Sequence, residues 1–169
     1  MILVTVGHKE FDRLIKKMDE LVNKIDDEVV MQIGDRPKYV PKNSKCFRFL
    51  TREEIDNYYR EADLIISHCS VGVLLRAQKY FKPIIVVPRQ YALKEHVDDH
   101  QVEFADMLIE QNNIQGINFI FDIDELGDTI ERMLQDKKGF AMKTFGEREC
   151  LINTLKDFVF DLYKPTEKY

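Results

Sequence analysis

The segment spanning residues 63–103 constrains the fold more than any other part of the chain. It contains two short apolar runs, Leu64–Ser67 and Ile84–Val87, separated by an apolar pattern with helical spacing from Val71 to Gln78. This order predicts a strand, a helix and a second strand parallel to the first. Ligands of parallel sheets bind beyond the carboxyl ends of the strands, so residues 68–72 and 88–101 are expected to line one crevice.

The rest of the chain continues the alternation of strands and helices. Further strands are predicted at Ile2–Val6, Val29–Ile33, Cys46–Leu50 and Asn118–Phe121, and helices at 11–25, from Thr51, at 101–108, 123–134 and 147–163. The Thr51-Arg-Glu-Glu54 sequence is typical of a capping box at a helix start. We therefore expect an α/β protein with a Rossmann-like, doubly wound parallel sheet, and a single domain over residues 1–169.

The helix expected at 147–163 has a broad apolar stripe that must bury one face. It packs on its own domain, docks on a partner subunit or lies at a membrane interface, and the sequence leaves these open, although its polar face is not strongly basic. The Asp122-Ile-Asp124 pair has the spacing of a metal-binding motif. Because it opens a predicted helix and is followed by Glu125, we expect an N-terminal cap there instead.

Composition excludes several classes of protein. The net charge of −5, with no stripe of lysine and arginine, argues against nucleic acid as a partner. Three cysteines outside any paired motif predict neither a disulfide framework nor a zinc site, and they suit a reducing compartment. No apolar run reaches the length of a membrane span and no leader precedes the first strand, so a cytoplasmic location is expected.

The turn after the first predicted strand excludes two common nucleotide-binding motifs. Gly7 is the only glycine in that turn, whereas a dinucleotide fingerprint needs three. No phosphate-binding loop with the G-x-x-x-x-G-K-[ST] pattern occurs in the chain. Dinucleotide binding and ATP hydrolysis are therefore both disfavoured.

Seven short motifs together resemble a known family. They are VTVG at 4–7 with FDRLI at 11–15, QIGD at 32–35, FRFL at 47–50, EADLIISH at 61–68, KPIIVVPR at 82–89 and EHVDDHQ at 95–101. In order and spacing they resemble the donor-binding, C-terminal half of the MurG-like GT-B enzymes in glycosyltransferase family 28. The likeness is strongest to stand-alone subunits of dolichol-linked oligosaccharide and bacterial exopolysaccharide synthesis.

The resemblance implies a function for the whole chain. We expect the donor-binding subunit of a heterodimeric glycosyltransferase, which transfers a hexose or N-acetylhexosamine from a UDP-sugar to a lipid-linked or polysaccharide acceptor. The partner would be a membrane-associated subunit that binds the acceptor, and it could hold this chain at the inner face of the membrane. Such enzymes need no bound metal and no cofactor.

Chemistry and resemblance together predict the donor site. The helix beginning at Ser70, Val71 and Gly72 offers unpaired N–H groups to a diphosphate, and Arg89 or His68 would add charge-assisted hydrogen bonds. Resemblance places the uracil near Leu50 and the sugar hydroxyls near Gln101. The complete set of expected donor-binding residues is Gly7, His8, Leu50, His68, Ser70, Val71, Gly72, Arg89, Glu95, His96, Asp99, His100 and Gln101, with His68 also a catalytic candidate.

Some positions depart from the family pattern. Ser70 and Phe81 stand at common glycines, His8 at a threonine, Val73 at a hydroxyl residue and Arg76 at a glutamate that bonds ribose in many relatives. These departures keep open an alternative, a non-catalytic relative that binds a nucleotide or a protein. Gly72 is expected to allow close packing of its helix on a strand, which is compatible with contact to a ligand.

Overall fold

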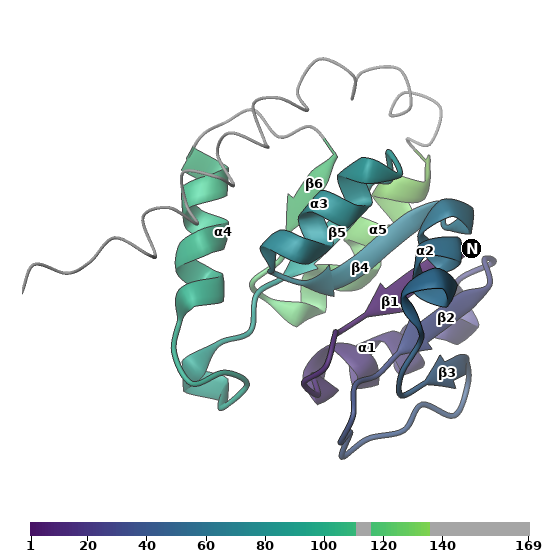
Figure 1. Ribbon diagram of the computed structural model, residues 1–169, viewed down its shortest axis with the longest axis horizontal. Coiled ribbons are helices and arrows are strands. Elements are labelled where there is room, and N and C mark those ends of the chain that lie inside the picture. The colour runs from purple at the N-terminus through teal and green to yellow at the C-terminus, as the bar shows by residue number, and fades with distance from the viewer. Residues whose placement is uncertain (111–115, 136–169) are drawn as a thin grey trace, which may run out of the picture.

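The computed structural model describes residues 1–110 and 116–135, which form a sheet covered by helices on both faces (Figure 1). The helix expected at 147–163 and Cys150 lie outside these residues. Within them, no helix is long and apolar enough to cross a membrane.

All strands of the sheet are parallel. Their order is β3-β2-β1-β4-β5-β6, so the chain turns from one side of β1 to the other between β3 and β4. Ligands of such sheets bind at this reversal of strand order. The strands are β1 (Ile2–Thr5), β2 (Val29–Gln32), β3 (Lys45–Phe47), β4 (Leu64–His68), β5 (Ile84–Val87) and β6 (Ile117–Phe119).

The helices form two layers (Figure 1). Alternate side chains of each central strand point to opposite faces, so Val4 and Ile66 pack with α1 and α5, whereas Leu3 and Ile65 pack with α2, α3 and α4. The fold class is therefore the expected Rossmann-like α/β sheet. The helices are α1 (Asp12–Leu21), α2 (Arg52–Glu61), α3 (Val71–Lys79), α4 (His100–Glu110) and α5 (Leu126–Gln135), with short 3-10 turns η1 (Val22–Lys24), η2 (Tyr91–Leu93) and η3 (Ile123–Glu125).

The predicted strand Cys46–Leu50 is wrong at its carboxyl end. β3 stops at Phe47, because the carbonyl of Arg48 accepts a hydrogen bond from the Gln32 side chain (2.9 Å) instead of continuing the backbone ladder. The segment 48–50 thus leaves the sheet and forms a loop over the ends of β1 and β2. β6 likewise begins and ends slightly earlier than predicted.

The predicted caps are confirmed. The Thr51 hydroxyl accepts from Glu54 N and the Glu54 carboxylate accepts from Thr51 N, which completes the capping box of α2. Asp122 accepts a hydrogen bond from Asp124 N (2.9 Å) and caps η3, as expected for the Asp122-Ile-Asp124 pair.

Candidate functional site

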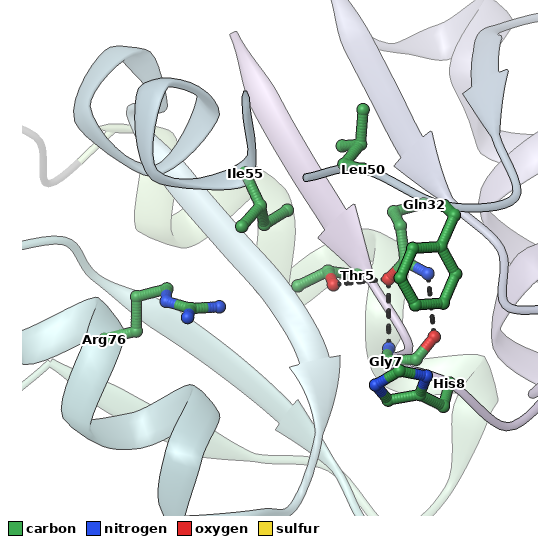
Figure 2. Close-up of a pocket in the computed structure, with 8 residues that line it drawn as sticks. Thr5, Gly7, His8, Gln32, Leu50, Ile55 and Arg76 are labelled. Atoms are coloured by element: carbon green, nitrogen blue, oxygen red, sulfur yellow. Dashed lines mark hydrogen bonds between the residues drawn. The ribbon is translucent and has the colours of Figure 1, made fainter. Parts of the chain in front are cut away.

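A pocket of about 180 Å³ opens at the carboxyl ends of β1 and β2 (Figure 2). The loop before α2 and the side chain of Arg76 from α3 form its other walls. It lies beside the reversal of strand order, where sheets of this type bind ligands. Its lining residues are Thr5, Gly7, His8, Gln32, Phe49, Leu50, Ile55 and Arg76.

Gln32 builds the floor of this pocket. Its Oε1 accepts hydrogen bonds from the Thr5 hydroxyl (2.8 Å) and Gly7 N (3.0 Å), and its Nε2 donates to Gly7 O (2.7 Å) and Arg48 O (2.9 Å). Figure 2 shows the bonds to Thr5 and Gly7. Every hydrogen-bonding position of the amide is used within the protein. Gln32 therefore positions the two loops instead of offering a free group to a ligand.

Aromatic side chains form one side of the pocket mouth. The rings of His8 and Phe49 lie 4.8 Å apart between centroids and are tilted by 56°, which brings the two rings into contact. Phe49 is nevertheless 53% exposed, which leaves part of its ring facing solvent. Leu50 and Ile55 add apolar surface on the neighbouring wall.

Arg76 supplies the positive charge of the opposite wall. Its Nε lies 3.1 Å from the Asp56 carboxylate, and its guanidinium carbon lies 5.6 Å from the centre of the Tyr59 ring. These two contacts orient the guanidinium, which points toward the pocket in Figure 2. No acidic side chain is among the residues that line the pocket.

The amino end of α3 is arranged as the sequence predicts. Ser70 is the N-cap residue, and its hydroxyl accepts from Val73 N at 3.4 Å. A Cβ built on Gly72 would meet nothing within 4 Å, so the expectation that Gly72 allows close packing of its helix on a strand is wrong. The space beside Gly72 is open, which suits the approach of a ligand to the first N–H groups of the helix.

His68 ends β4 and is buried against Gly7. Gly7 has a left-handed backbone (φ +70°), and a Cβ there would lie 3.2 Å from the His68 ring. The His68 Nδ1 lies 3.2 Å from the Ser67 hydroxyl, which donates to Thr5 O. Burial, together with the nearby Arg89 charge, lowers the pKa of His68 to about 3. The imidazole is therefore neutral at pH 7, which suits hydrogen bonding and not a fixed positive charge.

Arg89 is held inside the protein at 3% exposure. Its guanidinium donates to Val6 O and Lys9 O, both at 2.8 Å, so it ties the end of β5 to the loop after β1. Burial lowers its pKa to about 10, which leaves it charged at pH 7. The backbone N–H of Arg89 donates to the Gln101 side chain (3.1 Å), which places Gln101 at the same edge of the sheet.

The loop that follows Arg89 uses several predicted site residues internally. Glu95 accepts from Arg13 Nε (2.7 Å) and from Gln90 N (3.0 Å), and Asp99 accepts from Tyr91 N (2.9 Å). His96 and His100 contact the carboxylates of Asp98 and Glu103. These contacts fix the shape of the loop at the edge where β1, β4 and β5 end.

The structure thus divides the predicted residues into groups. Three of them line the pocket: Gly7, His8 and Leu50. His68 lies against Gly7 at the end of β4. The start of α3, which follows β4, is formed by Ser70, Val71 and Gly72. Arg89 and Gln101 bond each other, and Glu95, His96, Asp99 and His100 belong to the loop before α4 or to its first turn. The pocket also includes four residues that the sequence did not predict as site residues, and Arg76, which stands where many relatives have a ribose-bonding glutamate. The four are Thr5, Gln32, Phe49 and Ile55.

A larger hollow of about 560 Å³ lies between η1 and α5. Asp26, Asp27, Asp128 and Glu131 line it, and Asp27 contacts the amino terminus of the chain. It therefore lies at the amino ends of the strands, and its acidic rim disfavours a diphosphate. The smaller pocket is the better candidate for a nucleotide.

A six-stranded parallel sheet with helices on both faces defines a Rossmann-like α/β domain, and its candidate pocket lies beside the reversal of strand order. The model of the glycosyltransferase family 28 C-terminal domain matches residues 1–150. The chain therefore belongs to this family.

The chain is also similar to several known proteins. The chain is 27% identical over 122 residues to the UDP-N-acetylglucosamine transferase subunit ALG13 of Mus musculus, covering 66% of this chain and about a tenth of that protein's length. It is similar in fold to MurG of Acinetobacter baumannii, with a TM-score of 0.60, 17% identity and coverage of 95% of this chain and 48% of that one. The solution structure of ALG13 matches with a TM-score of 0.53 and 19% identity, covering 80% of this chain and 86% of that one.

Proposed function

We propose that this chain is the donor-binding subunit of a two-chain glycosyltransferase that uses a UDP-sugar. The observation that carries the proposal is the arrangement of three features at one edge of the sheet. Leu50, Arg76 and Gly7 line the pocket, His68 lies against Gly7 at the end of β4, and the amino end of α3, which follows β4, has open space beside Gly72. A nucleotide sugar has the same order of parts, which are base and ribose, diphosphate, and sugar.

The diphosphate would lie at the amino end of α3. The first N–H groups of a helix are unpaired and carry a partial positive charge. The interaction of an anion with this charge contributes about 0.3–1 kcal/mol near a surface, so it orients the diphosphate more than it binds it. During transfer the same N–H groups would stabilise the negative charge that develops on the leaving UDP.

The sugar would lie toward Gln101 and the loop before α4. The Gln101 Oε1 is occupied by Arg89 N, but its amide nitrogen has no hydrogen-bond partner among residues 1–110 and 116–135. That nitrogen is a donor suited to a sugar hydroxyl. His68, neutral and next to Gly7, would donate or accept one hydrogen bond near the diphosphate or the sugar.

The acceptor would come from a second, membrane-associated subunit. The name of the mouse relative describes it as a subunit of a transferase, and about half of the MurG chain lies outside the match to this protein. The proposed acceptor is lipid-linked or a growing polysaccharide. The proposed transferred group is a hexose or N-acetylhexosamine.

The proposal predicts that the chain binds UDP and that Gln101→Glu abolishes transfer in the reconstituted pair. Glutamate keeps an oxygen that accepts from Arg89 N, so the loop stays in place, but it removes the amide donor. Calorimetry with UDP and a transfer assay with the partner subunit measure the two effects. Asn57→Ala, on the exposed face of α2, is the control and keeps full activity.

The outcomes separate the alternatives. UDP binding with loss of transfer in Gln101→Glu supports the donor-binding role. If neither the chain nor its complex binds UDP, the chain is a protein-interaction relative and the proposal fails. If Gln101→Glu transfers sugar at the wild-type rate, the assignment of the sugar site is wrong.

A further inference from the structure

Arg13, in the first turn of α1, joins segments that are far apart in the sequence. Its Nε and Nη2 donate to the two carboxylate oxygens of Glu95 at 2.7 and 3.0 Å. The same Nη2 donates to Pro88 O (3.1 Å), directly after β5, and Nη1 donates to Phe121 O (3.4 Å), shortly after β6. The guanidinium therefore connects both parts of the loop between β5 and α4 with the segment that follows β6.

The carboxylate of Glu95 is used within the protein. Its Oε1 accepts from Arg13, and its Oε2 accepts from Arg13 and from Gln90 N (3.0 Å). The side chains of Arg13 and Glu95 are only 17% and 10% exposed, so solvent screens this ion pair less than a surface pair. Two parallel hydrogen bonds between a guanidinium and a carboxylate also fix their relative orientation. These contacts assign Glu95 to the structure of the loop, whereas the family resemblance implies a direct contact with the donor.

Arg13 and Arg89 hold different parts of this edge of the sheet. Both guanidinium carbons lie over the Phe11 ring, at 5.3 and 5.0 Å from its centre. Arg89 donates to Val6 O and Lys9 O of the loop after β1, whereas Arg13 holds the loop after β5. Arg13 is also not among the residues that line the pocket. Its removal is therefore expected to leave the loop after β1 and the pocket in place.

The loop held by Arg13 leads to the proposed position of the transferred sugar. Tyr91 N donates to Asp99 (2.9 Å), and Arg89 N donates to the Gln101 side chain (3.1 Å), so the start of the loop is bonded to the start of α4. A displacement of this loop would move the Gln101 amide relative to the sugar. A shift of about 1 Å in such a group can reduce a rate about 100-fold.

We propose that Arg13 is a positioning residue for sugar transfer, which acts through its ion pair with Glu95 and does not contact the donor. The pair holds the loop between β5 and α4 in the shape that brings Gln101 to the sugar. The pocket and the amino end of α3 bind UDP without it. This inference rests on the proposed function, because that function assigns Gln101 to the sugar and α3 to the diphosphate.

Arg13→Ala and Glu95→Ala test the ion pair with two measurements. Calorimetry should give both variants the wild-type affinity for UDP. In contrast, kcat/KM for sugar transfer should fall about 10- to 100-fold in both. Transfer is measured with the partner subunit and whichever of UDP-glucose, UDP-galactose and UDP-N-acetylglucosamine the wild-type pair uses fastest. A variant that failed to fold would lose both properties, so the retained affinity for UDP separates positioning from folding.

Lys17→Ala is the matched control. Lys17 lies one turn further along α1 and pairs with Asp124 on η3, so it also links α1 to the segment after β6. Its ion pair does not involve the loop between β5 and α4, and the variant should keep both wild-type values. Arg13→Lys keeps a positive charge near Glu95 but loses the planar fork, so it should show the same kind of loss and serves if Arg13→Ala does not fold.

The double variant Arg13→Ala/Glu95→Ala separates a positioning role of the pair from a direct role of Glu95. If the two residues act only together, the double variant should lose no more of kcat/KM than the more affected single variant. If Glu95 also touched the donor, the two losses would multiply, and this result would overturn the inference.

The remaining outcomes distinguish the inference from the function on which it rests. If the wild-type pair binds UDP and transfers sugar, and the folded Arg13 variants keep the wild-type kcat/KM, the inference fails while the proposed function stands. A lowered affinity for UDP in a folded Arg13 variant also overturns the inference. If the wild-type chain, alone and with its partner subunit, neither binds UDP nor transfers any of the three sugars, both fail.

Discussion

Gln32 shows how one side chain sets the geometry of the candidate site. It is the last residue of β2, and its amide bonds both backbone groups of Gly7 and the carbonyl of Arg48. The pocket floor and the loop bearing Phe49 therefore depend on the same residue. A polar side chain at the end of a buried strand is the sequence signal that points to it.

We predict that Gln32→Glu destabilises the protein by about 2 kcal/mol or more at pH 7, as measured by urea unfolding. The carboxylate cannot donate, so it faces the carbonyls of Gly7 and Arg48 without hydrogen bonds. At acidic pH the protonated carboxyl donates to one of them, so the difference from the wild type should narrow. Gln135→Ala, at the exposed end of α5, is the control. A constant difference across pH would contradict this account.

Arg89 shows that a residue type alone does not reveal a role. An arginine after a buried strand is a reasonable ligand for phosphate, and the sequence predicts it as a donor-binding residue. In the structure its guanidinium bonds two backbone carbonyls of the loop after β1. Its proposed influence on the donor therefore acts through the position of that loop and of Gln101.

At the scale of elements, the carboxyl end of α3 has an unusual residue. Phe81 N donates to Gln78 O (3.0 Å) and Lys82 N to Ala77 O (2.9 Å), the hydrogen bonds of a Schellman motif. The residue that must be left-handed in this motif is normally glycine, but here it is Phe81, with φ 53°. Phe81 stands where glycine is common in the family, and the left-handed backbone at this helix end explains why glycine is common there.

We predict that Phe81→Gly raises the free energy of unfolding by up to about 1 kcal/mol. The left-handed backbone costs a non-glycine residue roughly 1–2 kcal/mol, and the greater freedom of glycine in the unfolded chain offsets part of the gain. Urea unfolding measures the change. Phe81→Ala keeps the unfavourable backbone and should be less stable than Phe81→Gly. The opposite ranking of these two variants would show that side-chain contacts of Phe81 outweigh the strain.

At the scale of the whole molecule, two buried groups make stability depend on pH. Asp19 on α1 is 2% exposed and accepts hydrogen bonds from Tyr39 (2.6 Å), Lys42 N and Asn43 N of the loop before β3. Burial opposes its ionisation, but these hydrogen bonds outweigh burial and hold its pKa below the usual range. Burial lowers the pKa of His68 to about 3.

We predict that the free energy of unfolding falls steadily as pH decreases below about 6.5. Both groups take up protons more readily in the unfolded chain, so acid favours unfolding. His68 should lower the free energy of unfolding by roughly 1 kcal/mol per pH unit as the pH falls from about 6.5, its pKa in the unfolded chain, to about 3, its pKa in the folded protein. Asp19 should lower the free energy of unfolding further below about pH 4. Urea unfolding from pH 7.5 to pH 3.5 measures the slope.

Two variants assign the slope to its sources. His68→Gln should make the free energy of unfolding nearly independent of pH above pH 4. Asp19→Asn should lower the free energy of unfolding at pH 7, and below about pH 4 the variant and the wild type should differ less in stability. Asp26→Asn, on the exposed turn before β2, serves as the control and leaves the curve unchanged. A wild-type curve that is flat between pH 6.5 and pH 4.5 would contradict the role of buried His68.

The sequence by itself determined the alternation of strands and helices, the capping of α2 and η3 and the family. These features depend on local periodicity and on residues close together in the chain, so they can be recognised without tertiary contacts. It also predicted a site at the carboxyl ends of the strands, where the candidate pocket lies, because parallel strands of this topology end at one edge.

Only the tertiary structure decided which side chains form the pocket and which serve the fold. Gln32 bonds residues 25 and 16 positions away, and Arg89 bonds carbonyls more than 75 positions away. Such bonds depend on how distant strand ends meet, and no local pattern encodes them. The same residue types, an amide, an arginine or a phenylalanine, become a positioning group, a buried clamp or one side of a pocket mouth according to the partners that folding brings within reach.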